Sequence, residues 1–502
     1  MARVSIIADF MDGMNILRNI VRVAGKYSNK AAFVIDGMAY SYGELFSYVR
    51  GIRSFLGKRE EEIIGVVAEN RIETYASILA VLLAGKTYVI LHPHYPDNRN
   101  NKIREAGDIQ VVLYADECNM AASMPESVMF VCTRTLREEQ EVEYCFGEED
   151  TKAYIIFTSG STGEPKGVPI TRRNLNAFYT AYSALGWNLG PDDRMLQMFE
   201  LTFDVSVVSM LYPLTVGACV YTVGQDSMKY MKVYELLEDE HLTFAAIAPS
   251  LLQFLSPYFD EIRLPDLKYL IVTAEAAQVD VLVRFRECAP NAEFVNLYGP
   301  TEATIYCTAY RIPREECKHY HGMIAIGRPF EGMDILIADE EGKALNAGEK
   351  GELWVSGAQV MGGYWKDREK SEQVLVHHDG QVYYKTGDLC YVDPDGDVIY
   401  CGRKDYQVKV QGFRVELNEI EYTARKYYRD EKNVIVVAKK EEDGGCELHL
   451  FVEAAECDSK SLLEFMKMHL PSYMLPSGVH CLEVFPLGTS NKIDRKKLLS
   501  LV

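Results

Sequence analysis

Short apolar runs separated by longer stretches of mixed charge recur along most of the chain. Residues 63–67, 154–157 and 269–272 are rich in Ile, Val, Leu and Tyr, and a helix-compatible stretch follows each run. Runs of this length and composition are typical of buried strands. The pattern predicts an α/β body in which mainly parallel β-sheets are covered by helices.

The pattern changes in the last third of the chain. From residue 351 to 400, apolar stretches alternate with turn sequences such as Asp-Pro-Asp-Gly-Asp at 393–397. Such alternation is typical of antiparallel strands joined by tight turns. We expect a β-rich subdomain at about 320–402.

A further change follows residue 402. The segment 418–428 has helical character, and 433–438 and 447–452 have the composition of strands. We therefore predict a large N-terminal core of residues 1–402 and a small α+β domain of residues 403–502.

Composition is that of an ordinary globular protein. The chain has 502 residues, more than one hydrophobic core usually organises, and 48% of them are hydrophobic. Its 12 cysteines include no Cys-x-x-Cys pair, and the nearest two, Cys307 and Cys317, are too far apart for a zinc knuckle. We expect reduced, mostly buried thiols.

The sequence offers neither an export signal nor a membrane span. Asp9 and Asp12 interrupt the first apolar run, and the longest apolar stretch, 75–85, ends at Lys86, well short of the roughly 20 residues that cross a bilayer. We expect a cytoplasmic protein without membrane insertion.

The charge of the chain is strongly negative and uneven. The net charge of −20 disfavours nucleic acid as a partner. Residues 403–502 are balanced, with 16 basic and 16 acidic residues, whereas 37 basic and 57 acidic residues precede them. This contrast is either chance composition or the mark of a domain that approaches an acidic partner.

The segment 158–167, Thr-Ser-Gly-Ser-Thr-Gly-Glu-Pro-Lys-Gly, directly follows an apolar run. Its glycines let backbone amides converge on an anion, and its hydroxyls and Lys166 add donors and charge, which suits a triphosphate. It is not a Walker loop, because Pro165 precedes the lysine and Gly167 follows it. A flexible linker is the alternative, although linkers rarely follow a buried strand.

With this loop the sequence resembles the adenylate-forming superfamily of acyl- and aryl-CoA synthetases, luciferases and amino-acid adenylation domains. The likeness covers nearly the whole chain and is nearest to stand-alone amino-acid adenylation enzymes such as D-alanine–carrier protein ligase. Six further motifs stand in the order of that family: Phe203-Asp204-Val205-Ser206, Asn296-Leu297-Tyr298-Gly299-Pro300-Thr301-Glu302, Gly351-Glu352-Leu353, Tyr384-Lys385-Thr386-Gly387-Asp388-Leu389, Gly402-Arg403-Lys404-Asp405 and Asn491-Lys492-Ile493-Asp494-Arg495.

The resemblance implies a ligase that activates an amino acid with ATP and Mg²⁺ as an aminoacyl-adenylate, releasing pyrophosphate. The acyl group would then form a thioester with the phosphopantetheine of an acyl or peptidyl carrier protein. Neither step needs a protein nucleophile. The implied ATP-binding residues are Thr158, Ser159, Gly160, Ser161, Thr162, Gly163, Lys166, Asn296, Tyr298, Gly299, Asp388 and Arg403.

Several of these residues have distinct implied roles at the nucleotide. Tyr298 would stack on adenine, and Asn296 would hydrogen-bond to its edge. Asp388 would accept both ribose hydroxyls, and Arg403 would reach the ribose or a phosphate. Thr301 would contact the α-phosphate.

Catalysis and the second step involve other positions. The resemblance assigns catalysis to Thr301, Glu302 and Lys492: Glu302 would help bind Mg²⁺, and Lys492 would bridge the substrate carboxylate and the α-phosphate. Asp405 would be the hinge about which the small domain swings. Lys409 and Gly412 would then face the active site, with Gly412 leaving room for a pantetheine arm.

Asp204 separates amino-acid activators from other members, because its carboxylate would pair with the α-ammonium group. A buried Asp without a partner is costly, although backbone amides could also satisfy it. The other pocket positions are mostly apolar and include no charged residue, which favours a small or modest neutral amino acid: Val205, Val208, Ser250, Ile271, Thr273, Leu297, Ile305 and Tyr306. D-Alanine ligases carry cysteine at the position of Thr273, which argues against D-alanine itself.

Two alternatives stay open. An acyl- or aryl-CoA ligase would be favoured if Asp204 faced away from the pocket, and a degenerate paralogue would bind nucleotide or a partner without turnover. No serine-bearing carrier motif follows Lys492, so we expect the thiol acceptor on another chain.

Overall fold

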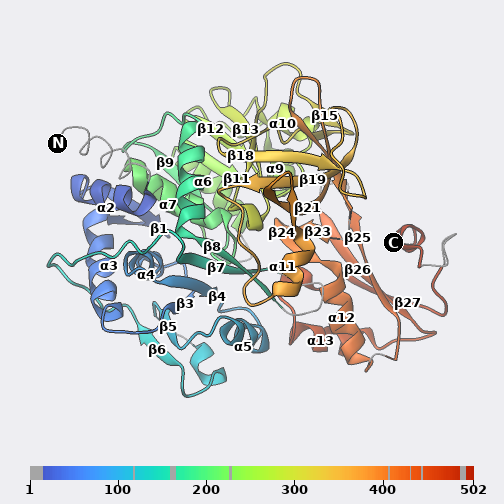
Figure 1. The fold of residues 1–502 in the computed structure, drawn as a ribbon, viewed down its shortest axis with the longest axis horizontal. Coiled ribbons are helices and arrows are strands. Elements are labelled where there is room, and N and C mark those ends of the chain that lie inside the picture. The colour runs from blue at the N-terminus through green and yellow to red at the C-terminus, as the bar shows by residue number, and fades with distance from the viewer. Residues whose placement is uncertain are drawn as a thin grey trace.

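The computed structural model describes residues 15–116, 119–158, 165–224, 229–404, 407–429, 431–441, 445–486 and 493–502. Its strands and helices alternate through most of the chain, so the expected α/β class is confirmed. The three strands predicted first are all present, as β3 (Ile63–Val67), β7 (Lys152–Thr158) and β12 (Tyr269–Val272). Figure 1 shows the sheets at the centre of the body, with helices around them.

The largest sheet has nine strands. In spatial order they are β17 (Arg328–Pro329), β14 (Thr308–Arg311), β13 (Glu293–Tyr298), β12, β11 (Phe244–Ile247), β9 (Arg194–Gln197), β10 (Cys219–Thr222), β1 (Ala31–Ile35) and β2 (Met38–Ser41). The strands from β13 to β1 are parallel, and antiparallel strands close both edges. The carboxyl ends of the parallel strands therefore share one edge, where ligands bind in open α/β sheets.

A second sheet has six strands. Their order is β6 (Met129–Cys132), β5 (Val111–Tyr114), β3, β4 (Thr87–Leu91), β7 and β8 (Lys166–Thr171). Only β8 in this sheet runs antiparallel to its neighbour. The predicted phosphate loop connects β7 to β8, so its two ends are fixed by paired strands.

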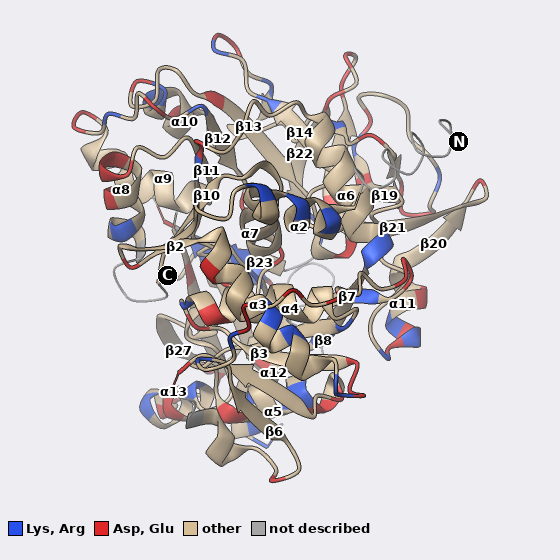
Figure 2. Cartoon of the chain, turned by 90° about the vertical axis from the view of Figure 1, so that its left-hand side faces the viewer, with Lys and Arg blue, Asp and Glu red and all other residues tan. Residues whose placement is uncertain are grey.

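The helices of the body pack on these sheets. They are α2 (Ile16–Lys26), α3 (Tyr42–Leu56), α4 (Ile72–Leu83), α5 (Asp97–Ala106), α6 (Arg172–Ala184), α7 (Val205–Val216), α8 (Lys229–Asp239), α9 (Pro249–Leu255) and α10 (Val279–Phe285). Short 3-10 helices cover Asn119–Ser123, Ser256–Tyr258 and Thr301–Ala303. In Figure 2 the positions of Asp and Glu alternate with those of Lys and Arg along the helices and loops, so neither charge is confined to one element.

The long apolar stretch at 75–85 lies mostly within α4. Glu73 is the only residue of this helix that is not buried, as expected for a helix that is apolar on all sides. None of the helices in the described parts of the chain has the length and apolar character that a bilayer crossing requires.

The strands predicted between residues 351 and 400 are confirmed. A five-stranded sheet contains β18 (Met333–Ala338), β19 (Gly351–Gly357), β21 (Gln381–Val392), β20 (Leu375–His378) and β22 (Val398–Arg403). A short hairpin of β15 (His319–Tyr320) and β16 (Met323–Ile324), and helix α11 (Arg368–Val374), accompany it.

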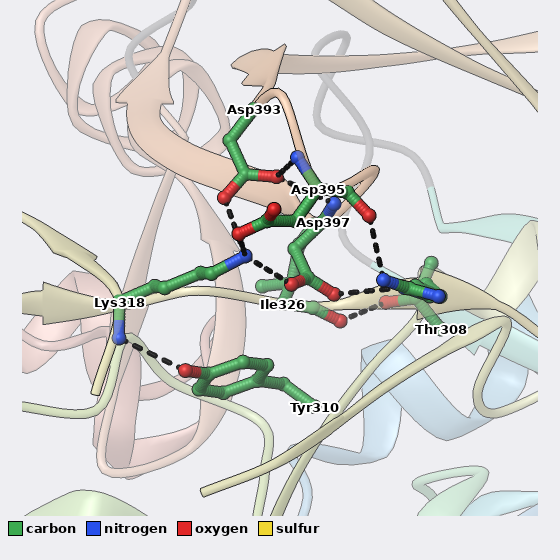
Figure 3. Close-up of polar contacts among 8 residues, drawn as sticks. Thr308, Tyr310, Lys318, Ile326, Asp393, Asp395 and Asp397 are labelled. Carbon is green, nitrogen blue, oxygen red and sulfur yellow. Dashed lines mark hydrogen bonds and ion pairs between the residues drawn. The ribbon is translucent and has the colours of Figure 1, made fainter. Parts of the chain in front are cut away.

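The turn between β21 and β22 is held by Lys318, whose ammonium lies between 2.5 and 2.8 Å from three carboxylates. These belong to aspartates of the turn that surround Lys318 in Figure 3: Asp393, Asp395 and Asp397. Arg328 adds a hydrogen bond of 2.6 Å to a carbonyl oxygen of the same turn. Because Asp388 and Arg403 are paired residues of β21 and β22, these contacts fix the strands that carry both.

The C-terminal part contains the elements that the sequence predicts. The hairpin β23 (Gln407–Val410) and β24 (Phe413–Glu416) leads into α12 (Leu417–Tyr427), followed by β25 (Val434–Lys440), β26 (Cys446–Glu453) and β27 (Gly478–Leu482). Helices α13 (Ser459–Lys467) and α14 (Arg495–Leu499) and a 3-10 turn, Ser472–Met474, complete it. Its buried apolar residues form clusters separate from the main core, and it occupies the right-hand side of Figure 1.

The expectation that every cysteine is reduced is wrong for one pair. Cys457 and Cys481 form a disulfide across 24 residues of sequence. Cys481 lies on β27, which pairs in parallel with β26, and Cys457 follows the end of β26. No local pattern in the sequence indicates this pairing, because tertiary structure creates it. The other described cysteines are free thiols, buried or half-buried except for Cys145.

Candidate active site

A cavity of about 1050 Å³ lies at the carboxyl ends of β7, β11, β12 and β13 and is closed by the β23–β24 hairpin. Most of the described residues that the sequence assigns to ATP, substrate or thioester formation line it. They are Thr158, Asp204, Val205, Ser250, Thr273, Asn296, Leu297, Tyr298, Gly299, Thr301, Ile305, Tyr306, Asp388, Arg403, Lys409 and Gly412.

A few predicted positions lie elsewhere. Val208 and Ile271 are buried in the main core rather than in the cavity wall, because α7 and β12 turn these side chains into the packing beneath it. Lys166 and Glu302 lie just behind the wall. The remaining predicted residues are outside the described parts of the chain: Ser159, Gly160, Ser161, Thr162, Gly163, Asp405 and Lys492.

Asp388 is rigidly held at one end of the cavity. Its Oδ1 lies 2.7 Å from Arg403 Nη1, and its Oδ2 accepts a hydrogen bond of 2.5 Å from the Tyr298 hydroxyl. Burial and the neighbouring carboxylate raise the pKa of Tyr298, so its hydroxyl stays a donor. Each carboxylate oxygen retains further acceptor capacity, so the cavity face of Asp388 suits a diol such as a ribose.

Two neighbouring polar side chains can also serve a nucleotide. Asn296, two residues before Tyr298 on β13, donates to the carbonyl oxygen of Ala325 at 2.9 Å, which fixes its amide in the cavity wall. The hydroxyl of Thr158 is buried and has no hydrogen-bond partner among the described residues. An unpaired buried hydroxyl at the start of the predicted phosphate loop suits an anionic ligand.

Gly299 is required by the close approach of two chain segments. A Cβ at this position would lie 2.5 Å from the carbonyl oxygen of Ile305 and 2.6 Å from Cα of Tyr306. The absence of a side chain brings the segment after β13 against the wall of the cavity. A side chain at this position would push Tyr298 and Thr301 away from this wall.

Asp204 directly precedes α7, lines the same cavity and is only 7% exposed. Its Oδ2 has no hydrogen-bond partner within the described residues. Burial raises its pKa from the usual 3.8 to about 6, although a hydrogen bond from Thr301 and the charge of Lys409 oppose that rise. A buried carboxylate with a free oxygen beside a cavity fits a cationic ligand group.

The cavity wall near Ser250 includes a carboxylate that the sequence did not suggest. Glu275 accepts hydrogen bonds from the backbone N–H groups of Ser250, at 2.8 Å, and Gly412, at 2.6 Å. Both oxygens are therefore engaged with protein. Gly412 has a φ of +85°, the left-handed region that favours glycine, so the turn of the β23–β24 hairpin depends on it.

Glu302 is fully buried and surrounded by cationic and hydroxyl groups. Its Oε2 lies 2.8 Å from Arg414 Nη1, and its Oε1 accepts from the Tyr364 hydroxyl at 2.8 Å, with Lys166 Nζ at 3.4 Å. Burial alone would raise the pKa of Glu302, but the charges of Arg414 and Lys166 outweigh it and hold this pKa well below its usual range.

The arrangement around Glu302 does not fit a Mg²⁺ ion. Both carboxylate oxygens already bind protein groups, and two of these groups are cations that would repel a metal. Among the described residues, no three His, Cys, Asp or Glu side chains gather as ligands for an ion. The predicted metal role of Glu302 therefore requires a different arrangement of Arg414.

Glu275 and Tyr364 were missed in the sequence, and Arg414, in a segment expected to face the site, was given no role there. Glu275 and Tyr364 carry no motif, and their partners are distant in the chain. Arg414 follows Gly412 by two residues in a segment that the sequence did assign to the cavity. A basic residue within a segment expected to face the cavity is the signal that could have found Arg414.

Residues 20–365 of this chain match the family described as AMP-binding enzyme. The chain belongs to that family. It is a member of the adenylate-forming superfamily. Tyr298, Asp388 and Arg403, which the resemblance assigned to a nucleotide, thus line one cavity in a member of that superfamily.

Two relatives among the AMP-binding enzymes illustrate the similarity. Gramicidin S synthase 1 of Brevibacillus brevis is 30% identical over 488 residues, which cover 94% of this chain and 43% of that protein. Zwittermicin A synthase ZmaJ of Bacillus cereus is 31% identical over 460 residues, 89% of this chain and 86% of that one. The chain spans less than half the length of the larger synthases, and only 13% of tyrocidine synthase 2 of Brevibacillus parabrevis.

Solved structures share the fold. The Vibrio cholerae adenylation domain AlmE, in complex with glycyl-adenosine-5'-phosphate, has a TM-score of 0.87 at 24% identity, with 97% of each chain covered. Holo-PA1221, a nonribosomal peptide synthetase protein with adenylation and PCP domains, has a TM-score of 0.82 at 23% identity, covering 97% of this chain and 84% of that one.

Proposed function

We propose that this AMP-binding enzyme activates a small or modest neutral amino acid as an aminoacyl-adenylate and transfers it to the phosphopantetheine thiol of a carrier protein on another chain. The observation that carries the proposal is Asp204. It is a buried carboxylate with an oxygen unpaired among the described residues, and it lies in the wall of the cavity that Tyr298, Asp388 and Arg403 also line. An α-ammonium group is the ligand that such a carboxylate fits.

The described residues support a binding mode for ATP. Asp388 would hold the ribose, Tyr298 and Asn296 would contact the adenine, and Thr158 and Arg403 would donate to ribose or phosphate oxygens. The loop residues 159–163 and Lys492 remain predictions from their motifs. Their implied task is to neutralise charge on the phosphates during the first step.

The chemistry balances without a protein nucleophile. A carboxylate oxygen of the amino acid forms a bond to the α-phosphorus, and the bond to the bridging oxygen of pyrophosphate breaks. A thiol then attacks the acyl carbon, AMP departs, and the thiol proton passes to solvent or to the departing phosphate. Positioning and charge neutralisation by the chain would supply most of the rate.

A metal such as Mg²⁺ normally neutralises a triphosphate in this kind of transfer. Glu302 does not offer it a free oxygen in the present arrangement. Arg414 would have to withdraw before Glu302 could bind such an ion.

Other features of the proposal concern organisation and partners. We infer that residues 1–402 form the adenylating core and that 403–502 form a mobile unit carrying Lys492, with Asp405 as the hinge. The use of ATP and free amino acids supports a cytoplasmic location. A relative in which adenylation and PCP domains occur together supports a carrier protein as the acceptor.

The test is ATP–pyrophosphate exchange with the purified chain, across L- and D-amino acids, with benzoates and fatty acids as controls. We expect one group of neutral amino acids to support exchange. Exchange with aryl or fatty acids alone would replace the proposal with a CoA-ligase function, and exchange with glutamate or lysine above all neutral amino acids would overturn the predicted specificity. No exchange with any acid would favour a nucleotide-binding protein without turnover.

A further inference from the structure

Tyr306 carries a polar atom that the fold leaves unused. Its side chain is only 1% exposed, and its hydroxyl is buried without a hydrogen-bond partner among the described residues. Tyr154 and Trp187 also carry buried polar atoms without such a partner, but neither lines the cavity, whereas Tyr306 does. Because a buried hydroxyl without a partner costs stability, its place in the cavity wall points to a ligand group that pairs with it.

The hydroxyl of Tyr306 lies near two polar groups that also line the cavity. Burial raises the pKa of Tyr306. The Thr273 hydroxyl is close enough to lower this pKa and the Asp204 carboxylate close enough to raise it, although neither forms a hydrogen bond with Tyr306. The hydroxyl therefore stays protonated and can both donate and accept a hydrogen bond. The ring packs in the core against Phe178 and Tyr182, with centroids 6.2 and 6.3 Å away, which fixes its orientation.

Apolar side chains line the cavity beside these polar groups. Val205 directly follows Asp204, Ile305 directly precedes Tyr306, and Leu297 lies in the same wall. Apolar lining alone would favour a methyl group of the substrate over a hydroxyl group of similar size. A preference for the hydroxyl group must therefore come from a hydrogen bond, and Tyr306 offers one.

We propose that the Tyr306 hydroxyl selects amino acids that carry a hydroxyl group on Cβ, such as serine and threonine. The inference rests on the proposed function, in which Asp204 would hold the α-ammonium group. Because Tyr306 and Asp204 are neighbours in the cavity wall, the substrate group that meets Tyr306 lies near the substrate Cα. A hydroxyl group on Cβ is within this short reach, whereas the longer amide side chains place their polar atoms farther away.

The selection follows from what a mismatched substrate leaves behind. A hydroxyl group on Cβ would exchange a hydrogen bond with Tyr306, whereas a methyl group in its place would keep the Tyr306 hydroxyl buried and unpaired. A site of this kind rejects the analogue that lacks the polar group far more strongly than an apolar pocket rejects a change of one methyl group. Tyr306 takes no part in bond making, so its effect should depend on the substrate side chain.

The first arm of the test is pyrophosphate exchange with pairs of amino acids in which a methyl group replaces the hydroxyl. Serine is compared with 2-aminobutyrate, and threonine with valine, each as both enantiomers. We expect the wild type to favour the hydroxyl member of a pair by about 100-fold or more in kcat/KM. Tyr306→Phe should reduce this preference by about tenfold or more, mainly by lowering exchange with serine and threonine.

Tyr42→Phe is the matched control. Tyr42 is also fully buried, but it lies away from the cavity wall, and its hydroxyl donates to the carbonyl oxygen of Ala218 at 2.8 Å. This variant should keep the substrate preference of the wild type.

The second arm, thermal unfolding without ligands, compares the same two variants. Tyr42→Phe should lower the Tm because it loses a buried hydrogen bond, whereas Tyr306→Phe should leave the Tm unchanged or raise it. A fall of the Tm in Tyr306→Phe as large as in Tyr42→Phe would show that the fold already satisfies the hydroxyl, and it would overturn the inference.

The exchange results separate this inference from the proposed function. Equal exchange within each pair, or a preference for 2-aminobutyrate and valine, would overturn the inference and leave amino-acid activation in place. An equal loss with both members of each pair in Tyr306→Phe would place the hydroxyl at a group that they share, such as the α-ammonium group, and would also overturn it. No exchange with any amino acid would end the proposed function and the inference together.

Discussion

The buried environment of Asp204 disfavours the charged form of its carboxyl group. It is buried, and one of its oxygens lacks a partner among the described residues. Burial raises the pKa of Asp204 to about 6, so its ionised form destabilises the fold. Stabilising contacts elsewhere in the fold must offset this cost. Function explains why such a group is kept, since a cationic substrate would relieve the cost.

Asp204→Asn should therefore stabilise the empty protein at neutral pH while removing amino-acid activation. The pKa of Asp204 lies about 2 units above its usual value, so ionisation costs the fold about 2–3 kcal/mol. That cost grows as the pH rises from about 4 to above 6, and it is absent below the unfolded-state pKa.

Thermal unfolding at pH 7.5 and at pH 3.5 tests whether the charge of Asp204 destabilises the fold. We expect a higher Tm for Asp204→Asn than for the wild type at pH 7.5 and no difference at pH 3.5. Asp192→Asn, which removes only a surface ion pair with Lys30 at a side chain that is 93% exposed, should change the Tm little at either pH. A lower Tm for Asp204→Asn at pH 7.5 would show that a partner within the protein already satisfies the carboxylate.

The pH dependence of substrate binding follows from the same group. As the pH falls through about 6, Asp204 takes up a proton and loses its attraction for an α-ammonium group. The KM for the amino acid in pyrophosphate exchange should rise below pH 6, with the KM for ATP less affected. The rise should be missing in Asp204→Asn, which should lower kcat/KM about 100-fold or more at neutral pH.

Residues within strong motifs could be placed from the sequence, because the motifs name both the residue and its neighbours. Asp388, Tyr298 and Asp204 line one cavity as expected. Arg414 and Glu275 could not be placed, because their roles depend on a hairpin that packs against residues more than one hundred positions away.

At the scale of elements, the ion pairs between Lys318 and the turn at 393–397 join strands β21 and β22 to the rest of the β-rich region. The three aspartate partners of Lys318 lie in the turn that connects these strands. Arg403 ends β22, and its partner Asp388 lies within β21, on the same two strands. Loosening the turn should therefore affect the ribose end of the cavity.

Lys318→Met should raise the KM for ATP several-fold, with little change in the KM for the amino acid. Removal of the ammonium leaves only Arg328, 3.2 Å from Asp397, to offset three carboxylates, and their repulsion loosens the turn. Lys343→Met, at an exposed position in a neighbouring turn, is the control. Steady-state exchange kinetics measure the KM for ATP and the KM for the amino acid. An unchanged KM for ATP in Lys318→Met would show that the strands hold Asp388 without the ion pairs of Lys318.

Periodicity and composition were enough for the strands at 63–67, 269–272 and 447–452, because the first two are mainly buried apolar runs and the third is mostly apolar, with Glu447 exposed. The order of strands in the sheets and the disulfide between Cys457 and Cys481 could not be predicted, because both arise from contacts that leave no local pattern. The turn at 393–397 was expected, but not the lysine that organises it.

At the scale of the whole molecule, the C-terminal part is docked on the body through a few specific contacts. Arg99 on α5 and Glu419 on α12 form a buried ion pair at 2.7 Å. Nearby, the rings of Phe413 and Tyr473 stack, and Phe203 of the body packs edge-on against Phe413. These contacts fix one arrangement in which the hairpin enters the cavity, and the proposed swing must break them.

Asp405→Pro should separate the two steps of the proposed reaction. Proline fixes φ and so should hinder the swing about this position while leaving adenylate formation intact. Pyrophosphate exchange should persist and loading of a phosphopantetheine-bearing carrier should be lost, as followed by mass spectrometry of the carrier. Equal loss or equal retention of both activities would contradict a hinge at Asp405.

The measurement that tests the central claim most directly is pyrophosphate exchange with matched pairs of acids, such as alanine and propionate, that differ only in the α-ammonium group. The account predicts exchange with the amino acid that exceeds exchange with its partner by about 100-fold or more in the wild type, and loss of this difference in Asp204→Asn. Equal exchange with both acids in the wild type would contradict the assignment of Asp204 and, with it, amino-acid activation.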